Sequence, residues 1–245
     1  MAWYEDDEFW ATFGSYIYSD ERLRAAPAEV DQLLTLCPVA HPDVLDLCCG
    51  TGRHAVAFAK KGCRVTGVDR TRMALERARA AAAEAGVAVE FVEQDMREFV
   101  RPASFDLAVN MFTSFGYFES VDDERRVLRN LQTSLRPGGT LVIDVVGKEI
   151  LARGFQETHS ARGPDGTLFV WRNAIAEAWT RVAGEWHAVR EGRARSFKVD
   201  HWIYSGRELR DLLRQAGFGD VSLFGDLAGQ EYDTKATRLI AVARK

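Results

Sequence analysis

Short apolar runs alternate with amphipathic segments between Val44 and Val146. The apolar runs predict buried strands at 44–47, 64–68, 87–93, 105–111 and 140–146. The segments between them predict helices at 53–61, 71–85 and 122–135, and Gly62 and Gly86 stop the first two. Strands that alternate with helices in this way form right-handed βαβ crossovers. This part of the chain therefore predicts a mostly parallel, doubly wound sheet with helices on both faces.

The alternation of strands and helices stops after Val146, where aromatic residues occupy roughly every second position. The sequence between Gly154 and Tyr204 predicts an antiparallel β insertion with turns at 163–166 and at Ala183-Gly184. The aromatic side chains of this insertion are Phe169, Trp171, Trp179, Trp186, Phe197 and Trp202.

Helix and strand signals return after Tyr204. Ser205 and Glu208 have the spacing of a capping box, which predicts a helix that ends at Gly217. Strands are expected at 221–224 and 237–243. We therefore expect an α/β core at 37–150 and 205–245, an antiparallel β insertion at 151–204 that caps the substrate, and an N-terminal aromatic helical lid at 1–36.

Composition narrows the choice of partners. The chain has 245 residues, 47% of them hydrophobic and 28% charged, as is usual for a globular protein. Its formal net charge of −4 argues against general nucleic-acid binding, which needs a basic excess. The basic residues Arg190, Arg193, Arg195 and Lys198 are more simply interpreted as a solvated strand edge. We expect a small-molecule partner, with no nucleic acid and no membrane.

The sequence also indicates the compartment. Residues 1–18 are acidic and aromatic, unlike a signal peptide, and no apolar run approaches the ~20 residues of a membrane span. Cys37, Cys48, Cys49 and Cys63 have no C-x-x-C spacing and no histidine pattern typical of zinc, so no metal site is predicted. Reduced thiols of this kind are typical of a cytoplasmic protein.

A strand, a glycine turn and a helix follow one another from Val44 to Lys61. Gly50 and Gly52 let the main chain turn tightly and let a ligand approach the backbone. The helix that starts near Arg53 presents free N–H groups to a carboxylate or a phosphate. Asp69 ends the second strand, nineteen residues after Gly50, where a carboxylate can accept hydrogen bonds from a ribose diol.

This arrangement alone does not separate NAD-binding from S-adenosylmethionine-binding sheets. A dinucleotide loop needs G-x-G-x-x-G, but this chain has Cys48 at the first glycine position and Ala55 at the third. Asp46, at the strand end, can orient loop amides or meet an ammonium group. The missing first and third glycines disfavour NAD as the ligand. A tight turn without a ligand is the remaining alternative.

The run D-L-C-C-G-T-G, residues 46–52, resembles the first motif of class I S-adenosylmethionine-dependent methyltransferases, with Asp69 at the position of their ribose-binding acid. Three later segments resemble further motifs of that family in the correct order: E-Q-D-M (93–96), F-D-L-A-V-N-M-F (105–112) and L-R-P-G-G-T-L (135–141). The resemblance covers nearly the whole chain. It implies a seven-stranded sheet whose last strand, 237–243, runs antiparallel.

The resemblance also implies the residues that bind S-adenosylmethionine and its product S-adenosylhomocysteine. In the family, the acid after the third strand contacts the adenine amine and the next residue packs on the ring, which carries over to Asp95 and Met96. The methyl group is expected beside Asn110 and Met111. Cys48 replaces a common glycine, and its backbone role is kept if it avoids positive φ. The expected cofactor-binding residues are Asp46, Cys48, Gly50, Gly52, Arg53, Asp69, Arg70, Asp95, Met96, Asn110 and Met111.

Aromatic residues crowd the N-terminus, the insertion and the segment after the fourth strand, and they predict a partly apolar substrate pocket. The residues expected to line it are Tyr16, Tyr18, Phe112, Phe115, Tyr117 and Trp202, with core packing as the alternative for any single ring. A base is needed when the acceptor is an alcohol or a protonated amine. His201 and Tyr204 are the first candidates, and His187, Glu231 and Asp233 are the others.

The sequence thus predicts methyl transfer to a nitrogen, oxygen or carbon atom of a small molecule by in-line displacement. Residues 110–113 lack the Asn/Asp-Pro-Pro-aromatic run of nucleic-acid amine methyltransferases. A non-catalytic binder of S-adenosylmethionine or a nucleotide, and an NAD(P)-dependent oxidoreductase, are the alternatives. The acceptor and the oligomeric state, a homodimer included, stay open.

Overall fold

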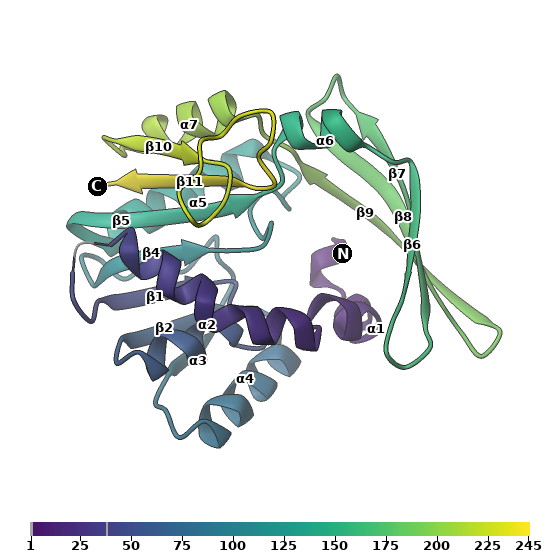
Figure 1. Cartoon of the computed structure of the whole chain (residues 1–245), viewed down its shortest axis with the longest axis horizontal. Coiled ribbons are helices and arrows are strands. Elements are labelled where there is room, and N and C mark those ends of the chain that lie inside the picture. Colours follow the sequence, from purple (N-terminus) through teal and green to yellow (C-terminus); the bar gives the residue numbers. More distant parts are fainter. Residues whose placement is uncertain (1, 38) are drawn as a thin grey trace.

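The structure, a computed structural model, describes residues 2–37 and 39–245, and these form two β-sheets with helices packed around them (Figure 1). The larger sheet has seven strands in the order β10-β11-β5-β4-β1-β2-β3. Its strands are β1 (Asp43–Leu47), β2 (Arg64–Asp69), β3 (Glu90–Glu93), β4 (Phe105–Asn110), β5 (Leu135–Val145), β10 (Val221–Phe224) and β11 (Leu239–Arg244). In this sheet β11 runs opposite to the six other strands, so the expected sheet is confirmed.

Helices cover both faces of this sheet, because successive apolar residues of its strands point to opposite faces. On β1, Leu45 and Leu47 face a hydrophobic cluster with side chains of α5 (Val121–Ser134) and α7 (Gly206–Gln215). Val44 faces the opposite cluster, with side chains of α2 (Asp20–Thr35) and α3 (Arg53–Lys60). The remaining helix of this core is α4 (Arg72–Glu84). The capping box of Ser205 and Glu208 begins α7 as expected.

The smaller sheet, called the cap sheet below, is fully antiparallel, with the order β6-β7-β8-β9. Its strands are β6 (Thr158–Arg162), β7 (Leu168–Ala176), β8 (Arg181–Arg190) and β9 (Arg193–Trp202). It stands beyond the end of the larger sheet that carries the loops after β4 and β5 (Figure 1). The expected antiparallel insertion is therefore present.

The N-terminal segment divides between the two sheets. Ala26, Val30 and Leu33 of α2 are buried in the cluster that contains α3. By contrast, α1 (Asp7–Ile17) packs Phe9 and Phe13 on the cap sheet, and a short 3-10 helix, η1 (Trp3–Glu5), precedes it. The segment expected as one lid, 1–36, thus consists of helices with different neighbours, and the lid role stays a prediction.

One predicted turn is wrong. Ala183 and Gly184 lie inside β8, paired with Ala174 and Asn173 of β7. The glycine is needed for close approach, because a Cβ at Gly184 would overlap the backbone carbonyl oxygen of Arg172 on β7. The chain reverses instead at three residues with positive φ, Glu177 (48°), Ala178 (52°) and Trp179 (69°).

Two further boundaries differ from the prediction. The helix α6 (Lys148–Gly154) was not expected, and β5 begins at Leu135 rather than at Thr140. Leu135 pairs with Phe105 before a register shift, so the Pro137-Gly138-Gly139 segment lies within the irregular start of the strand. At the other turn, residues 163–166 join β6 to β7 as predicted.

Candidate active site

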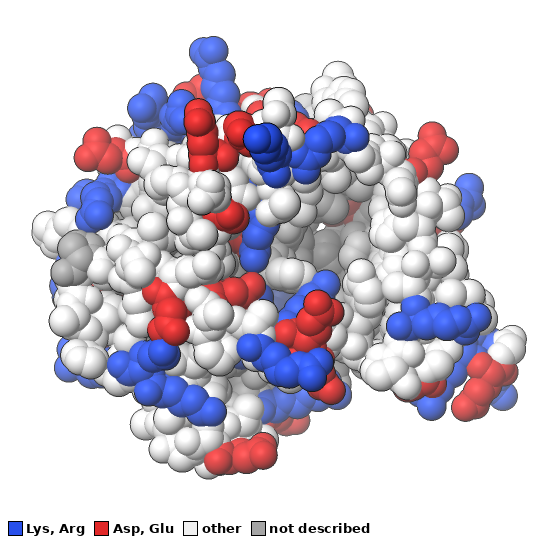
Figure 2. Space-filling model, viewed as in Figure 1, with Lys and Arg blue, Asp and Glu red and all other residues white. Residues whose placement is uncertain are grey.

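A cavity of about 770 Å³ lies between the C-terminal ends of the core strands and the inner face of the cap sheet. Asp46 and Asp69 come from the core side, Trp186 and His201 from the cap sheet, and Tyr16 from α1. In Figure 2 a hollow separates the α/β core from the cap sheet. The C-terminal edge of a parallel sheet is where α/β proteins bind ligands.

The glycine turn after β1 is held in left-handed conformations, with φ of 54° at Gly50 and 78° at Gly52. Gly52 packs so closely that a Cβ would lie 2.9 Å from the Cβ of Ala78, and it does not line the cavity. Cys48 also has positive φ, 64°, so the condition under which its backbone role would be kept is not met. A non-glycine residue there costs roughly 1–2 kcal/mol. Its Sγ lies 3.4 Å from Met96 Sδ at the cavity wall.

Two buried atoms of opposite charge meet no hydrogen-bond partner among the described residues: Oδ2 of Asp46 and Nη2 of Arg53. Both residues line the cavity. Burial raises the pKa of Asp46 to about 7, although the nearby Arg53 opposes the rise. Buried polar atoms are nearly always paired in folded proteins, so this pair favours a ligand with both an ammonium and a carboxylate group.

Asp69 holds the glycine turn from the end of β2. Its Oδ2 accepts a hydrogen bond from the Gly50 N–H at 2.9 Å, and its Oδ1 accepts one from the Thr71 N–H at 2.8 Å. Burial raises the pKa of Asp69, and these N–H groups oppose that rise. Each oxygen keeps a lone pair for a hydroxyl group, because a carboxylate has about four acceptor sites. Arg70, the next residue, donates to the Tyr4 carbonyl at 2.8 Å and lines the cavity.

Asp95 and Met96 follow β3 and both line the cavity. Asp95 accepts hydrogen bonds from the Arg97 N–H (2.8 Å) and from its guanidinium (2.7 Å). Burial would raise the pKa of Asp95, but these hydrogen bonds from Arg97 hold it below the usual value. The side chain thus caps the following turn and faces the cavity at the same time. Met96 is part of the core and of the cavity wall.

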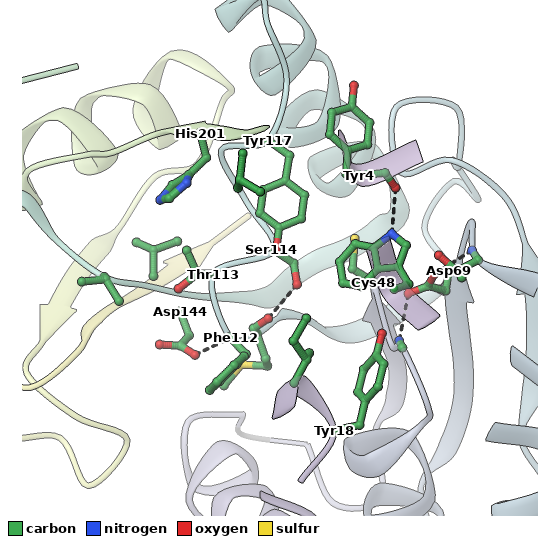
Figure 3. Close-up of a pocket in the computed structure, with 18 of the residues that line it drawn as sticks. Tyr4, Tyr18, Cys48, Asp69, Phe112, Thr113, Ser114, Tyr117, Asp144 and His201 are labelled. Atoms are coloured by element: carbon green, nitrogen blue, oxygen red, sulfur yellow. Dashed lines mark hydrogen bonds between the residues drawn. The ribbon is translucent and has the colours of Figure 1, made fainter. Parts of the chain in front are cut away.

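At the end of β4 the structure separates two residues that were expected together. Met111 lines the cavity, but Asn110 is fully buried and turned into the protein, where its Nδ2 donates to the Leu47 carbonyl at 3.1 Å. Phe112 follows with φ 62°, and its N–H donates to Asp144 Oδ2 at 2.7 Å (Figure 3). The Arg22 guanidinium lies 4.1 Å from the centre of the Phe112 ring.

Four of the six expected pocket residues line the cavity: Tyr16, Tyr18, Phe112 and Tyr117. Tyr18 covers the glycine turn, since its Cε1 would lie 3.0 Å from a Cβ at Gly50 (Figure 3). Phe115 and Trp202 do not line it. Phe115 is buried in the core, and Trp202 Nε1 donates to the Phe118 carbonyl at 2.7 Å.

The two candidate bases are also separated. His201, on β9, lines the cavity (Figure 3), and burial lowers its pKa to about 4, so the imidazole is neutral at neutral pH. Tyr204 does not line the cavity, because it packs in the core with its ring centre 5.6 Å from that of Phe115. Of the other candidates, His187 bonds Ser196 on the cap sheet, and neither Glu231 nor Asp233 lines the cavity.

A charged network beside the cavity was missed by the sequence reasoning. Glu29 of α2 forms ion pairs with Arg53 and Arg238 and a hydrogen bond with His54, and Arg238 also pairs with Asp144. Asp144 and Arg238 line the cavity. Their separation along the chain gives no pattern that would reveal the contact, although Asp144 does lie near the C-terminal end of β5, where site residues gather. In the part of the chain that is described, no helix has the length and apolar character needed to cross a membrane.

Comparison with known proteins agrees with this geometry. Residues 44–139 match a family model described as a methyltransferase domain. A protein of Geobacillus sp. (strain WCH70) that is named as a methyltransferase is 31% identical over 212 residues, which cover 82% of this chain and 84% of that protein. The dTDP-3-amino-3,4,6-trideoxy-alpha-D-glucopyranose N,N-dimethyltransferase of Streptomyces venezuelae is 28% identical over 195 residues, 79% of this chain and 73% of that enzyme.

The fold has close structural relatives as well. The crystal structure of an S-adenosylmethionine-dependent methyltransferase from Clostridium acetobutylicum ATCC 824 matches with a TM-score of 0.80 at 16% identity, covering 97% of this chain and 98% of that chain. The strand order, the ordered motifs and the Geobacillus relative lead to one conclusion. The chain belongs to the class I S-adenosylmethionine-dependent methyltransferases, and S-adenosylmethionine is its cofactor.

Proposed function

We propose that the protein methylates a nitrogen, oxygen or carbon atom of a small molecule that binds in the cavity beneath the cap sheet. The observation that carries this proposal is the enclosure of the cofactor motifs. Asp69 and the Gly50 turn share one cavity with Tyr16 of α1 and Trp186 of the cap sheet. A partly apolar cavity of about 770 Å³ is of the size that small ligands occupy.

The amino-acid end of S-adenosylmethionine is assigned to Asp46 and Arg53. Their unpaired buried atoms would receive the ammonium and the carboxylate group, respectively. Gly50 and Cys48 would line the same end with backbone atoms. This assignment is supported by the opposite charges, which no single inorganic ion would satisfy.

The nucleoside end is assigned to the residues after β2 and β3. Asp69 would accept hydrogen bonds from the ribose diol, and Asp95 would accept one from the adenine amine. Met96 and Arg70 line the cavity at this end, and Met111 lies on the side of β4. Asn110 is left out of this assignment, because its side chain lies away from the cavity.

Bound S-adenosylmethionine supplies a methyl group on a sulfonium, which passes in line to the acceptor while the sulfur keeps the bonding electron pair. The protein then has to position the acceptor and exclude water. The neutral His201 imidazole has a free lone pair, so it can accept a hydrogen bond from an O–H or N–H of the acceptor and receive its proton. Tyr204 is not proposed for this role, because it does not line the cavity.

The names of relatives support a small acceptor. The Streptomyces venezuelae relative is named as an N,N-dimethyltransferase of a nucleotide-linked amino sugar. A different relative, from Streptomyces sp., is named as a cypemycin N-terminal methyltransferase. The enclosure by α1 and the cap sheet favours a small molecule over the end of a polypeptide, without favouring a nucleotide-linked one.

The proposal is tested in two steps. Calorimetry should detect binding of S-adenosylmethionine and S-adenosylhomocysteine, and no binding of NAD. A screen of metabolites with the methyl-labelled cofactor should then transfer label to a small molecule. Label that enters only peptides or nucleic acids would contradict the proposal.

A further inference from the structure

The register of the cap sheet arranges its inner face in rows. Trp171, Trp186 and Phe197 are paired across β7, β8 and β9, and Trp171 and Phe197 pack toward α1. Two residues further along β7, the next row is Asn173, Gly184 and Val199. The row after that places Val182 beside His201. Residues two apart on a strand share a face, so these rows look into the same cavity.

Gly184 places no side chain in the middle row, and the Asn173 amide lies beside its backbone. A Cβ at Gly184 would lie 2.5 Å from Asn173 Oδ1, so the amide lies across the glycine backbone. Asn173 and His201 both line the cavity. They reach it from β7 and β9, on either side of the strand that carries the glycine. The side chains therefore border one notch in the inner face of the cap sheet.

Both polar side chains are available for a ligand. Neither the Asn173 amide nor the His201 ring forms a hydrogen bond with any residue that the structure describes, and both side chains are half-buried. Their neighbours on this face are apolar, namely Val182, Trp186 and Val199. An amide and an imidazole in such surroundings lose solvation unless a partner arrives, and a ligand group can be that partner.

The cap side of the cavity carries no full charge. Among residues 151–204, all of which the structure describes, no lysine, arginine, aspartate or glutamate lines the cavity. Of the four arginines on the core side, Arg22 donates to the Ile17 carbonyl, Arg70 to the Tyr4 carbonyl, and Arg238 pairs with Asp144. The fourth, Arg53, is assigned to the carboxylate group of the cofactor. A phosphate or carboxylate on the acceptor would therefore meet no cation on the cap sheet.

We propose that Asn173 and His201, spaced by Gly184, form the acceptor-recognition site, and that this site takes an uncharged molecule with an apolar or aromatic body. The body lies against Trp186, and one hydroxyl or unprotonated amine group lies between the amide and the imidazole. This inference rests on the proposed function, because it names the acceptor class for the same cavity.

Three probes with one ring body test the charge preference: 2-naphthol, 2-naphthoate and 2-naphthyl phosphate. Binding to the protein saturated with S-adenosylhomocysteine is measured by calorimetry, and thymidine diphosphate serves as the probe for nucleotide-linked acceptors. We expect 2-naphthol to bind at least tenfold more tightly than any of the three anions. Absence of 2-naphthol binding, or equal or tighter binding of an anion, would overturn the inference.

Matched variants test the two residues. Asn173→Leu and His201→Phe should each weaken 2-naphthol binding about 5- to 50-fold. Arg172→Leu and His187→Phe change neighbouring positions on the other face of the same sheet and should leave it unchanged. The assignment would be contradicted if 2-naphthol binding were weakened only in the control variants, or if it were unchanged in Asn173→Leu and His201→Phe.

The affinity for S-adenosylhomocysteine distinguishes a wrong acceptor class from a wrong proposed function. It should stay within twofold in all four variants, which also shows that they are folded. If the unmodified protein failed to bind S-adenosylhomocysteine, the proposed function itself would fail. If it bound S-adenosylhomocysteine but preferred the anionic probes, only the acceptor class would be wrong.

Discussion

Asp46 and Arg53 bring opposite charges to one buried corner of the cavity, and the carboxylate there is only partly ionised at neutral pH. Burial raises the pKa of Asp46 to about 7. A protonated Asp46 attracts an ammonium group much less than a carboxylate does, so the affinity for S-adenosylhomocysteine should fall as the pH drops below about 7. The limiting slope is about tenfold per pH unit if one proton must leave.

Calorimetry between pH 5.5 and 8.5 checks this prediction. Asp46→Asn should bind more weakly at pH 8.5 and should show little dependence on pH, because the titrating group is gone. The same pH profile in both proteins would show that another group is responsible.

Asp69 should contribute to cofactor binding in two ways, by accepting hydrogen bonds from the ribose and by holding the Gly50 and Thr71 N–H groups. We expect Asp69→Ala to weaken S-adenosylhomocysteine binding by about 1–3 kcal/mol. Asp69→Asn keeps one acceptor oxygen, so its affinity for S-adenosylhomocysteine should fall by less. Calorimetry on the three proteins measures the difference, and an unchanged affinity in Asp69→Ala would rule out the ribose role.

For single residues, the sequence predicted which residues lie at the site better than it predicted their conformations. Of the eleven residues that motif order assigned to the cofactor, all but Gly52 and Asn110 line the cavity. Motif order did not predict that Cys48 adopts positive φ, because cysteine normally avoids that region. It also could not tell that Asn110 turns its amide toward the Leu47 carbonyl, since a strand end permits either direction.

At the scale of elements, α1 and the cap sheet behave as one packing unit. Phe13 is fully buried, with ring centres 5.3 Å from Phe169 and 5.4 Å from Trp186. Phe13→Ala should therefore lower the free energy of unfolding of this unit by about 3–5 kcal/mol. Chemical denaturation followed by tryptophan fluorescence measures the loss, since Trp186 lies beside the deleted ring.

Leu23→Ala on α2 is the matched control, because Leu23 is 44% exposed and should change stability by less than about 0.5 kcal/mol. The affinity of Phe13→Ala for S-adenosylhomocysteine should be largely kept, since Phe13 does not line the cavity. Equal small effects of the two substitutions would mean that α1 is not part of the packed unit.

The elements of the α/β core could be predicted because periodicity and glycines mark their ends. The connection between β7 and β8 could not, because Glu177, Ala178 and Trp179 carry no turn signal. The glycine that did suggest a turn, Gly184, is explained by the neighbouring strand, and a single sequence does not reveal such a contact.

At the scale of the whole molecule, Glu29 joins α2 to the core through Arg53, His54 and Arg238. Burial disfavours its charged form, but the hydrogen bond from His54 and the charge of Arg53 hold the pKa of Glu29 at about 2. A carboxylate whose pKa is lowered by folding stabilises the fold at pH values above its pKa in the unfolded chain. We therefore expect about 2–3 kcal/mol of stability to be lost as the pH falls from about 4.5 to 2.

Denaturation of the protein and of Glu29→Gln across this pH range tests the prediction. The variant should be less stable at pH 7 and should lose less on acidification, so the two curves should converge near pH 2. The exposed Glu98→Gln serves as the control and should follow the unmodified protein. Parallel curves for Glu29→Gln and the unmodified protein would assign the acid sensitivity to other carboxyl groups.

The separation of the hydrophobic clusters bears on how this protein can change over evolutionary time. The aromatic core of α1 and the cap sheet shares no buried residue with either cluster of the larger sheet, and Trp3 and Trp10 pack against both it and the α5–α7 cluster. Substitutions at distant sites without shared partners have nearly additive effects. Away from Trp3 and Trp10, the cap sheet can therefore accept substitutions that suit new acceptors with little effect on the cofactor end, so that one catalytic platform can serve a succession of substrates.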